Sequence, residues 1–138
     1  MIMKEGINMN EVQEFLKDCG TYYLATIDGD KPRVRPFGTI NIFEDHLYIQ
    51  TGKKKDVYKQ IEVNNNVEIC AFKDGKWLRV SGKLISDDRV EAKKNMLDKY
   101  PELRNMYDEN DDNTIVLYFE SATATFSSFT EPPKTIQF

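Results

Sequence analysis

The chain has 138 residues, 40% of them hydrophobic and 12% aromatic, which can fill a core and argues against intrinsic disorder. Its net charge of −4 provides no overall positive field, so we expect no nucleic-acid partner and no binding to a membrane. Two cysteines without CxxC spacing and a single histidine argue against a protein zinc site, and we expect no metal. The length suits one domain, which we expect to cover residues 1–138.

The segments that would direct the protein out of the cytoplasm are not evident in the sequence. The first six residues lack the continuous apolar run of a signal peptide, and no stretch is long enough to span a bilayer. We therefore expect a soluble, cytoplasmic protein with reduced cysteines, while export by another route stays open.

The first predicted helix begins at Asn10, which can cap it, with Gln13 three residues later in capping-box position. Gly20 ends this helix. One helical face carries the apolar residues Val12, Phe15, Leu16 and Cys19. We expect the helix to cover one edge or mouth of a sheet.

A β-hairpin is predicted next. Residues 22–27 are rich in strand formers, residues 28–30 are a turn signal, and a long second strand is predicted over residues 33–43. Pro36 cannot donate to a strand ladder, and Gly38 has no side chain to pack. Such a strand tolerates both residues at a bulge, or where a ligand lies against the backbone.

The remaining elements complete a mainly β pattern. Further strands are predicted over residues 46–50, 67–72, 77–85 and 114–126, and helices over residues 56–63 and 88–100. Pro101 ends the last helix, and one or two further helical turns are expected before residue 107. The alternation of the last strand shifts phase near Glu120-Ser121, which predicts a β-bulge. About six antiparallel strands with short helices predict a closed or partly open β-barrel.

A basic loop is the most informative local signal. Residues 51–55 read Thr-Gly-Lys-Lys-Lys between a strand end and a helix start, and Arg33 and Arg35 lie on a neighbouring strand. Cations beside a helix N-terminus are typical of a phosphate site. Taken singly, the lysine run is more often a solvated loop, the arginines suit weak surface ion pairs, and Trp77 suits a core or an interface.

The order of the motifs resembles the pyridoxamine 5′-phosphate oxidase-like family, the FMN-binding split barrels. The resemblance is clear over residues 22–85, and its motifs are the hairpin, Arg35-Pro-Phe-Gly, Leu47-Tyr-Ile-Gln-Thr, the basic loop, a helix ending in Asn-Asn, Val67-Glu-Ile, and Trp77-Leu-Arg-Val-Ser-Gly. It implies a split β-barrel of antiparallel strands and a homodimer that holds FMN in a cleft between its subunits.

The resemblance also implies the site residues. It places Arg35 toward the flavin, the backbone of residues 36–38 at the isoalloxazine edge, and residues 50–51 at the phosphate or the ring. The family's Arg-Lys phosphate pair falls on Asp56 and Val57, so we expect at least two lysines of the basic loop to replace it. The complete cofactor-binding set is Arg35, Pro36, Phe37, Gly38, Gln50, Thr51, Lys53, Lys54, Lys55 and Trp77.

These features favour an FMN-dependent oxidoreductase that transfers hydride or electrons between the flavin and an unidentified small substrate or electron donor. No acid–base pair or nucleophile stands out, so no catalytic side chain is predicted. Arg35 at the N1–C2 edge would stabilise reduced flavin and raise its potential. A non-catalytic flavin or haem carrier or sensor is the alternative, and an OB-like barrel that binds single-stranded nucleic acid is disfavoured by the negative charge.

Overall fold

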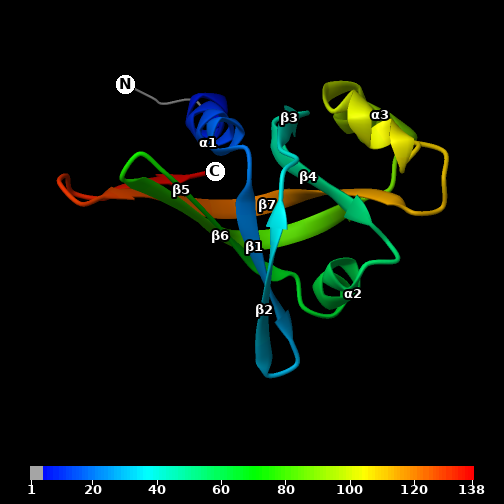
Figure 1. The fold of residues 1–138 in the computed structure, drawn as a ribbon, viewed down its shortest axis with the longest axis horizontal. Helices are drawn as coiled ribbons and strands as arrows, with labels where there is room; N and C mark the ends of the chain where they lie inside the picture. The colour runs from blue at the N-terminus through cyan, green and yellow to red at the C-terminus, as the bar shows by residue number, and fades with distance from the viewer. Residues whose placement is uncertain (1–4) are drawn as a thin grey trace.

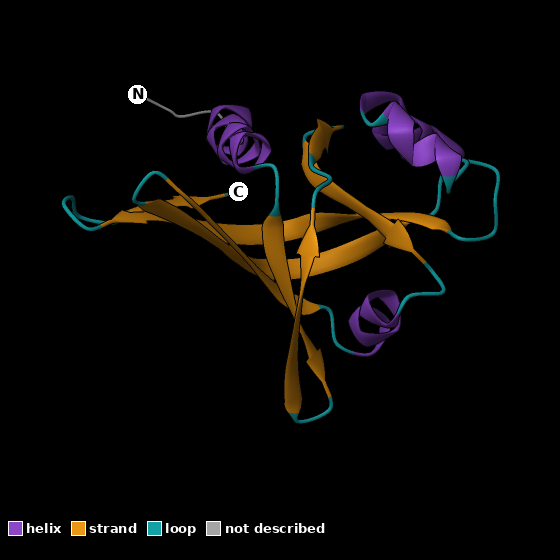
Figure 2. Cartoon of the chain, viewed as in Figure 1, coloured by secondary structure: helices purple, strands orange, loops and turns teal. Residues whose placement is uncertain are grey.

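The computed structural model describes the backbone of residues 5–138 and the side chains from residue 9 onward. The expectation for the first six residues therefore falls mostly outside the described part. Within that part, no helix is long and apolar enough to cross a membrane. The fold is mainly β, with all eight strands in one antiparallel sheet and helices placed around it (Figures 1 and 2).

The elements follow one another in the order expected for a barrel with helices at its rim. The helices are α1 (Glu5–Cys19), α2 (Asp56–Val63), α3 (Val90–Lys99) and the 3₁₀ helix η1 (Pro101–Asn105). The strands are β1 (Tyr22–Asp28), β2 (Lys31–Phe37), β3 (Asn41–Phe43), β4 (His46–Gly52), β5 (Asn66–Lys73), β6 (Lys76–Asp87), β7 (Thr114–Ser128) and β8 (Lys134–Gln137).

The sheet does not close on itself. Its strand order is β2-β1-β5-β6-β7-β4-β3, with β8 paired to β7 alone, so β2 and β3 are the two ends of a split barrel and β8 forms a further edge beside β7. Figure 1 shows the β1–β2 hairpin extending away from the other strands, with α2 on the same side of the molecule. The expected fold class is confirmed, with eight strands instead of about six.

The predicted strand over residues 33–43 is wrong as a single element. The chain leaves the sheet at residues 38–40, so that β2 pairs with β1 while β3 pairs with β4. The hydroxyl of Tyr100 takes the place of a ladder partner, because it accepts from Ile40 N (3.1 Å) and donates to Ile40 O (3.0 Å). A strand break therefore lies beside Gly38, in the stretch expected to meet the ligand.

The start of α1 differs from the prediction, whereas the bulge in the last strand agrees with it. α1 does not start at Asn10, because its buried face extends back to Met9 and packs with Val12 and Leu16 in the core. The bulge in the last strand is confirmed, since the β6–β7 register shifts between Gly82 and Leu84. Glycine is required there, because a Cβ at residue 82 would lie 2.4 Å from the carbonyl oxygen of Ser121.

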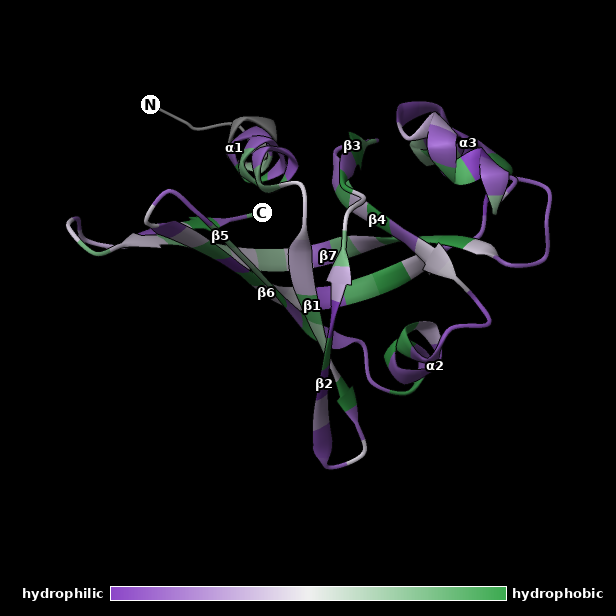
Figure 3. Ribbon diagram, in the orientation of Figure 1, coloured by the Kyte–Doolittle hydropathy of each residue, from purple (hydrophilic) through white to green (hydrophobic). Residues whose placement is uncertain are grey.

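Two apolar clusters hold the fold together. The larger fills the inner side of the sheet and receives α1 and the buried face of α2, which is Val57 and Ile61. The smaller lies under α3 and includes Tyr48, Met96 and Val116. Figure 3 shows hydrophobic residues along the middle of the long strands and hydrophilic ones at the hairpin tip and in the loop before β7. Burial of this apolar surface is the main stabilising contribution.

Candidate functional site

A hollow of about 430 Å³ lies where the β2–β3 break, the end of β4 and η1 meet. We call it the Phe37 hollow. It is lined by Gly20, Pro36, Phe37, Gly38, Thr39, Gln50, Thr51, Lys55, Tyr100, Glu102, Leu103, Met106 and Tyr107. Six of the residues expected at the cofactor therefore come together here, on one side of the hollow.

Two polar side chains at the end of β4 are built into this hollow. Gln50 and Thr51 are only 6% and 4% exposed. Gln50 Nε2 donates to Thr51 O (3.0 Å), but neither Gln50 Oε1 nor Thr51 Oγ1 has a hydrogen-bond partner within residues 9–138. No fully enclosed side-chain atom in that range lacks a partner, so both oxygens have access to the hollow that they line. Each can bind a ligand without first losing a protein contact.

A second hollow of about 420 Å³ lies between β2 and α2. We call it the Arg35 hollow. Its lining residues are Asp28, Arg33, Val34, Arg35, Lys55, Asp56, Val57 and Gln60. Lys55 lines both hollows, so they adjoin at this residue.

The guanidinium of Arg35 is fixed but not neutralised. It donates to Thr26 Oγ1 (2.7 Å), to Gln60 Oε1 (2.7 Å) and, at 3.2 Å, to the carbonyl oxygen of Leu24. All three acceptors are uncharged, and no carboxylate of the described residues forms an ion pair with it. Burial, and then the charge of Arg33, lower the pKa of Arg35, with Asp56 opposing them. A positive charge is thus held in place and left available to an anion.

The three lysines of the basic loop, Lys53, Lys54 and Lys55, have different environments in the structure. Lys53 Nζ pairs with Asp88 Oδ2 (3.0 Å), which raises the pKa of Lys53 chiefly through that hydrogen bond. Asp88 also pairs with the buried Lys93 (2.6 Å). Lys54 donates its backbone N–H to Asn113 Oδ1 (3.0 Å), its side chain has no hydrogen bond or ion pair within residues 9–138, and it lines neither hollow. Lys55 alone reaches them, at the start of α2, where no side chain caps the helix.

Trp77 lies elsewhere. It is on the outer face of β6, packed against Phe129 with ring centroids 5.1 Å apart, and it lines neither hollow of its own chain. The strand registers place Tyr23, Val34 and Phe72 on the same face, and all three are exposed. An apolar surface of this kind on a sheet indicates an interaction surface.

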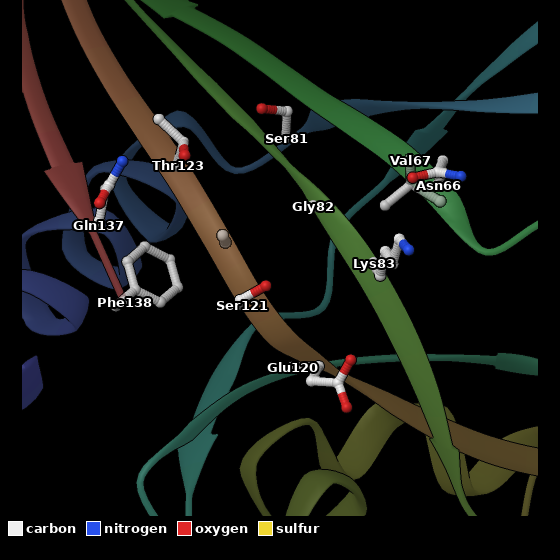
Figure 4. Close-up of a pocket in the computed structure, with 11 residues that line it drawn as sticks. Asn66, Val67, Ser81, Gly82, Lys83, Glu120, Ser121, Thr123, Gln137 and Phe138 are labelled. Carbon is white, nitrogen blue, oxygen red and sulfur yellow. The ribbon is translucent and has the colours of Figure 1, made fainter.

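A third hollow, of about 810 Å³, surrounds the bulge on the outer face (Figure 4). Five of its eleven lining residues carry a hydroxyl or an amide, and Lys83 and Glu120 are its charged residues. None of the residues expected at the cofactor lines it, and we do not assign it to the site.

Sequence reasoning missed the opposite wall of the Phe37 hollow and the supports of Arg35. The wall comes from η1 and the residues after it, whose helical turn was expected but whose place in the same hollow as residues 37–39 was not. Thr26 and Gln60 had no signal of their own, because they act only through the way that β1 and α2 meet.

Comparison with known proteins gives a consistent set of relatives. The family model for pyridoxamine 5′-phosphate oxidase matches residues 9–106, well over half of the chain. A NimC/NimA family protein from Clostridium acetobutylicum is 40% identical with a TM-score of 0.94, covering 97% of this chain and 94% of that one. No curated protein matches the sequence.

Two more distant structures share the fold. General stress protein 26 from Bacillus anthracis is 18% identical with a TM-score of 0.74, covering 95% of this chain and 99% of that one. A pyridoxamine 5′-phosphate oxidase-related, FMN-binding protein from Nostoc punctiforme is 13% identical with a TM-score of 0.67, covering 100% and 99%.

Proposed function

Because the chain belongs to the pyridoxamine 5′-phosphate oxidase family, we propose that it binds FMN across the two adjoining hollows as a cytoplasmic oxidoreductase. One observation carries the proposal. A cationic hollow, with an uncompensated arginine, meets an aromatic hollow with free hydrogen-bonding groups, and Lys55 lies at the junction. FMN has the same division, with a dianionic phosphate at one end and a flat ring at the other.

The Arg35 hollow suits the phosphate. Arg35, Lys55 and the uncapped start of α2 converge there, and an uncapped helix start leaves backbone N–H groups that bind anions. Charge-assisted hydrogen bonds from a fixed guanidinium are among the strongest in proteins. This placement favours Arg35 as a phosphate anchor over the position at the ring edge that the sequence suggested.

The Phe37 hollow suits the ring. Pro36, Phe37 and Gly38 offer an apolar surface and open backbone, while Gln50 Oε1 and Thr51 Oγ1 offer an acceptor and a hydroxyl. The edge of a flavin ring both donates and accepts hydrogen bonds, so these two groups can orient it. Bound FMN would supply the hydride or electron chemistry, and the chain would hold, orient and shield it.

We further propose that two chains form a homodimer. Trp77 lines neither hollow of its own chain, and the outer face that carries it also exposes Tyr23, Val34 and Phe72. A second chain would cover this apolar surface, and its hollows would then receive Trp77. Sedimentation at micromolar concentration should show a dimer, and a monomer that holds FMN fully would refute this arrangement.

The FMN proposal is tested by adding FMN to purified protein and recording its visible spectrum and affinity. We expect a yellow complex with two visible bands and a Kd in the micromolar range or below. Reduction of the bound flavin followed by reoxidation with small acceptors then tests the oxidoreductase step. Absence of FMN binding at these concentrations would overturn the proposed function, and a reduced flavin that no acceptor reoxidises would leave only a carrier.

A further inference from the structure

The η1 side of the Phe37 hollow is held rigidly. Tyr100 is fastened to both backbone groups of Ile40, at 3.1 and 3.0 Å. Arg104 donates to Asp98 (2.8 Å) and to Glu109 (2.6 Å), which ties η1 to the helix before it and the loop after it. A wall fixed in this way presents one surface to a ligand.

That surface is mainly apolar and carries one negative charge. Leu103 is half-buried, Met106 is 73% exposed, and Glu102 is exposed without an ion pair among the described side chains. The hydroxyl of Tyr100 already accepts a hydrogen bond from Ile40 N and donates one to Ile40 O. Among the residues that the structure describes, the other charged residue of the hollow is Lys55, which lies at the junction with the Arg35 hollow.

The two sides of the hollow therefore differ in what they can bind. The free amide oxygen and hydroxyl of residues 50–51 suit the polar edge of a flavin, whereas the η1 side has an apolar surface and a carboxylate. We propose that the η1 wall is the substrate-binding surface and takes a flat, apolar ring compound that carries no negative charge. The identity of this compound as the electron partner of the flavin rests on the proposed function, while the binding preference itself does not.

The preference follows from Glu102. Its carboxylate repels an anion at the mouth of the hollow and attracts a cation, and an exposed charge contributes enough for about a two- to five-fold change in affinity. Benzamide, benzamidine and benzoate test this preference, because they share one size and shape and are neutral, cationic and anionic.

The binding site can be observed without measuring activity. Protein labelled with 13C at the methionine methyl groups is titrated with each probe, with and without FMN. We expect the exposed Met106 methyl signal, assigned with Met106→Leu, to shift, while the buried Met96 signal does not. We expect benzamidine to bind about two- to five-fold more tightly than benzamide, and benzoate to bind more weakly by a similar factor.

Substitutions of Glu102 test whether its carboxylate sets the order of the three affinities. Glu102→Gln should abolish the difference between benzamidine and benzamide, and Glu102→Lys should make benzoate the tightest of the three. Glu120→Gln is the matched control, since Glu120 lies at the outer-face hollow and should leave the order unchanged. The inference is overturned if no probe moves the Met106 signal, or if Glu102→Lys keeps the wild-type order. Failure of FMN to bind is a separate result, because the titration without FMN still reports on the wall.

Discussion

Arg89 and Arg35 lie in different parts of the molecule and differ in their partners. Arg89 is paired with carboxylates, whereas Arg35 is hydrogen-bonded to uncharged groups. At one corner, Arg89 pairs with Glu44 Oε1 at 2.7 Å and with Asp87 Oδ2 at 2.9 Å. At the other, Arg35 has only uncharged acceptors. The Arg89 corner ties the β3–β4 turn to the start of α3, and the charge of Arg89 is fully paired there. The Arg35 corner keeps a fixed cation free, which is the arrangement expected where an anionic ligand binds.

The carboxylate of Asp87, at the Arg89 corner, is also fully paired. Burial alone would raise the pKa of Asp87, but hydrogen bonds from Arg89 and from Tyr48 (2.7 Å) outweigh it and lower that pKa. Burial and the neighbouring Asp87 raise the pKa of the Tyr48 hydroxyl. The group is therefore satisfied internally, and we interpret it as structural.

The largest effect expected from this comparison is on FMN affinity. Arg35→Met should weaken FMN binding by roughly ten- to a hundredfold, the equivalent of about 1.5–3 kcal/mol for a charge-assisted hydrogen bond. Isothermal titration or flavin absorbance measures it, and Arg89→Met is the control that should keep the wild-type affinity.

The same variant also distinguishes the two positions for Arg35. If Arg35→Met still holds oxidised FMN while its midpoint potential falls by some tens of millivolts, Arg35 lies at the ring edge instead of the phosphate. If neither affinity nor potential changes, the Arg35 corner is no more functional than the Arg89 corner.

At the Arg89 corner, the expected effect is on stability. Tyr48→Phe removes a hydrogen bond to a buried carboxylate and should lower the free energy of unfolding by about 1–2 kcal/mol, as measured by urea denaturation. FMN affinity should not change. A variant that loses FMN binding while keeping its stability would contradict the division between the corners.

The lysines of the basic loop give a smaller effect. Lys55→Ala should weaken FMN binding by about three- to tenfold, because Lys55 is exposed and screened by solvent. Lys53→Ala should have less effect, since Lys53 is paired with Asp88. The triple alanine variant separates two hypotheses. Its FMN affinity should equal that of Lys55→Ala if that lysine acts alone. It should be far lower than that of Lys55→Ala if two lysines bind the phosphate, as the sequence suggested.

The smallest effect is a pH dependence of stability. Burial opposes the shift of Asp111, but hydrogen bonds from Thr114, Asp108 and Asn113 outweigh it and hold the pKa of Asp111 at about 2. A depressed folded-state pKa adds stability above the ordinary value near 3.8, and this stability is lost as the pH falls toward 2. Thermal unfolding of the wild type should therefore shift to lower temperature over that interval, and Asp111→Asn should flatten the change. An unchanged slope in the variant would assign the acid sensitivity to other carboxylates, Asp87 first.

The sequence predicted those parts of the fold that depend on neighbouring residues. The helix of residues 56–63 was located to both ends, because the basic loop and the Asn64-Asn65 pair bound it. The bulge was visible as a change of alternation within one strand. Such signals are local, and tertiary contacts do not override them here.

The parts that the sequence could not predict depend on residues far apart in the chain. The strand break at residues 38–40 is stabilised by Tyr100, which lies 60 positions from Ile40. The Arg35 side chain is held by Thr26 of β1 and by Gln60 of α2, which lies 25 positions away. The order of the motifs predicted six residues that line one side of the Phe37 hollow. It could not predict that η1 forms the other side.

The bulge at Gly82 also determines which residues of β7 belong to the interior. Before it, Ile115, Leu117 and Phe119 pack in the larger apolar cluster, and after it Ala122 and Ala124 do. The change from odd to even numbers is produced by one additional residue on β7. Deleting Ser121 would therefore leave Glu120 alone opposite Lys83, so that the ladder would continue without a bulge and Ala122 and Ala124 would keep their inward positions. In a comparison of variants, a one-residue deletion at this point changes only the local bend and twist of the strand, whereas a one-residue deletion elsewhere in β7 would move every later side chain to the other face.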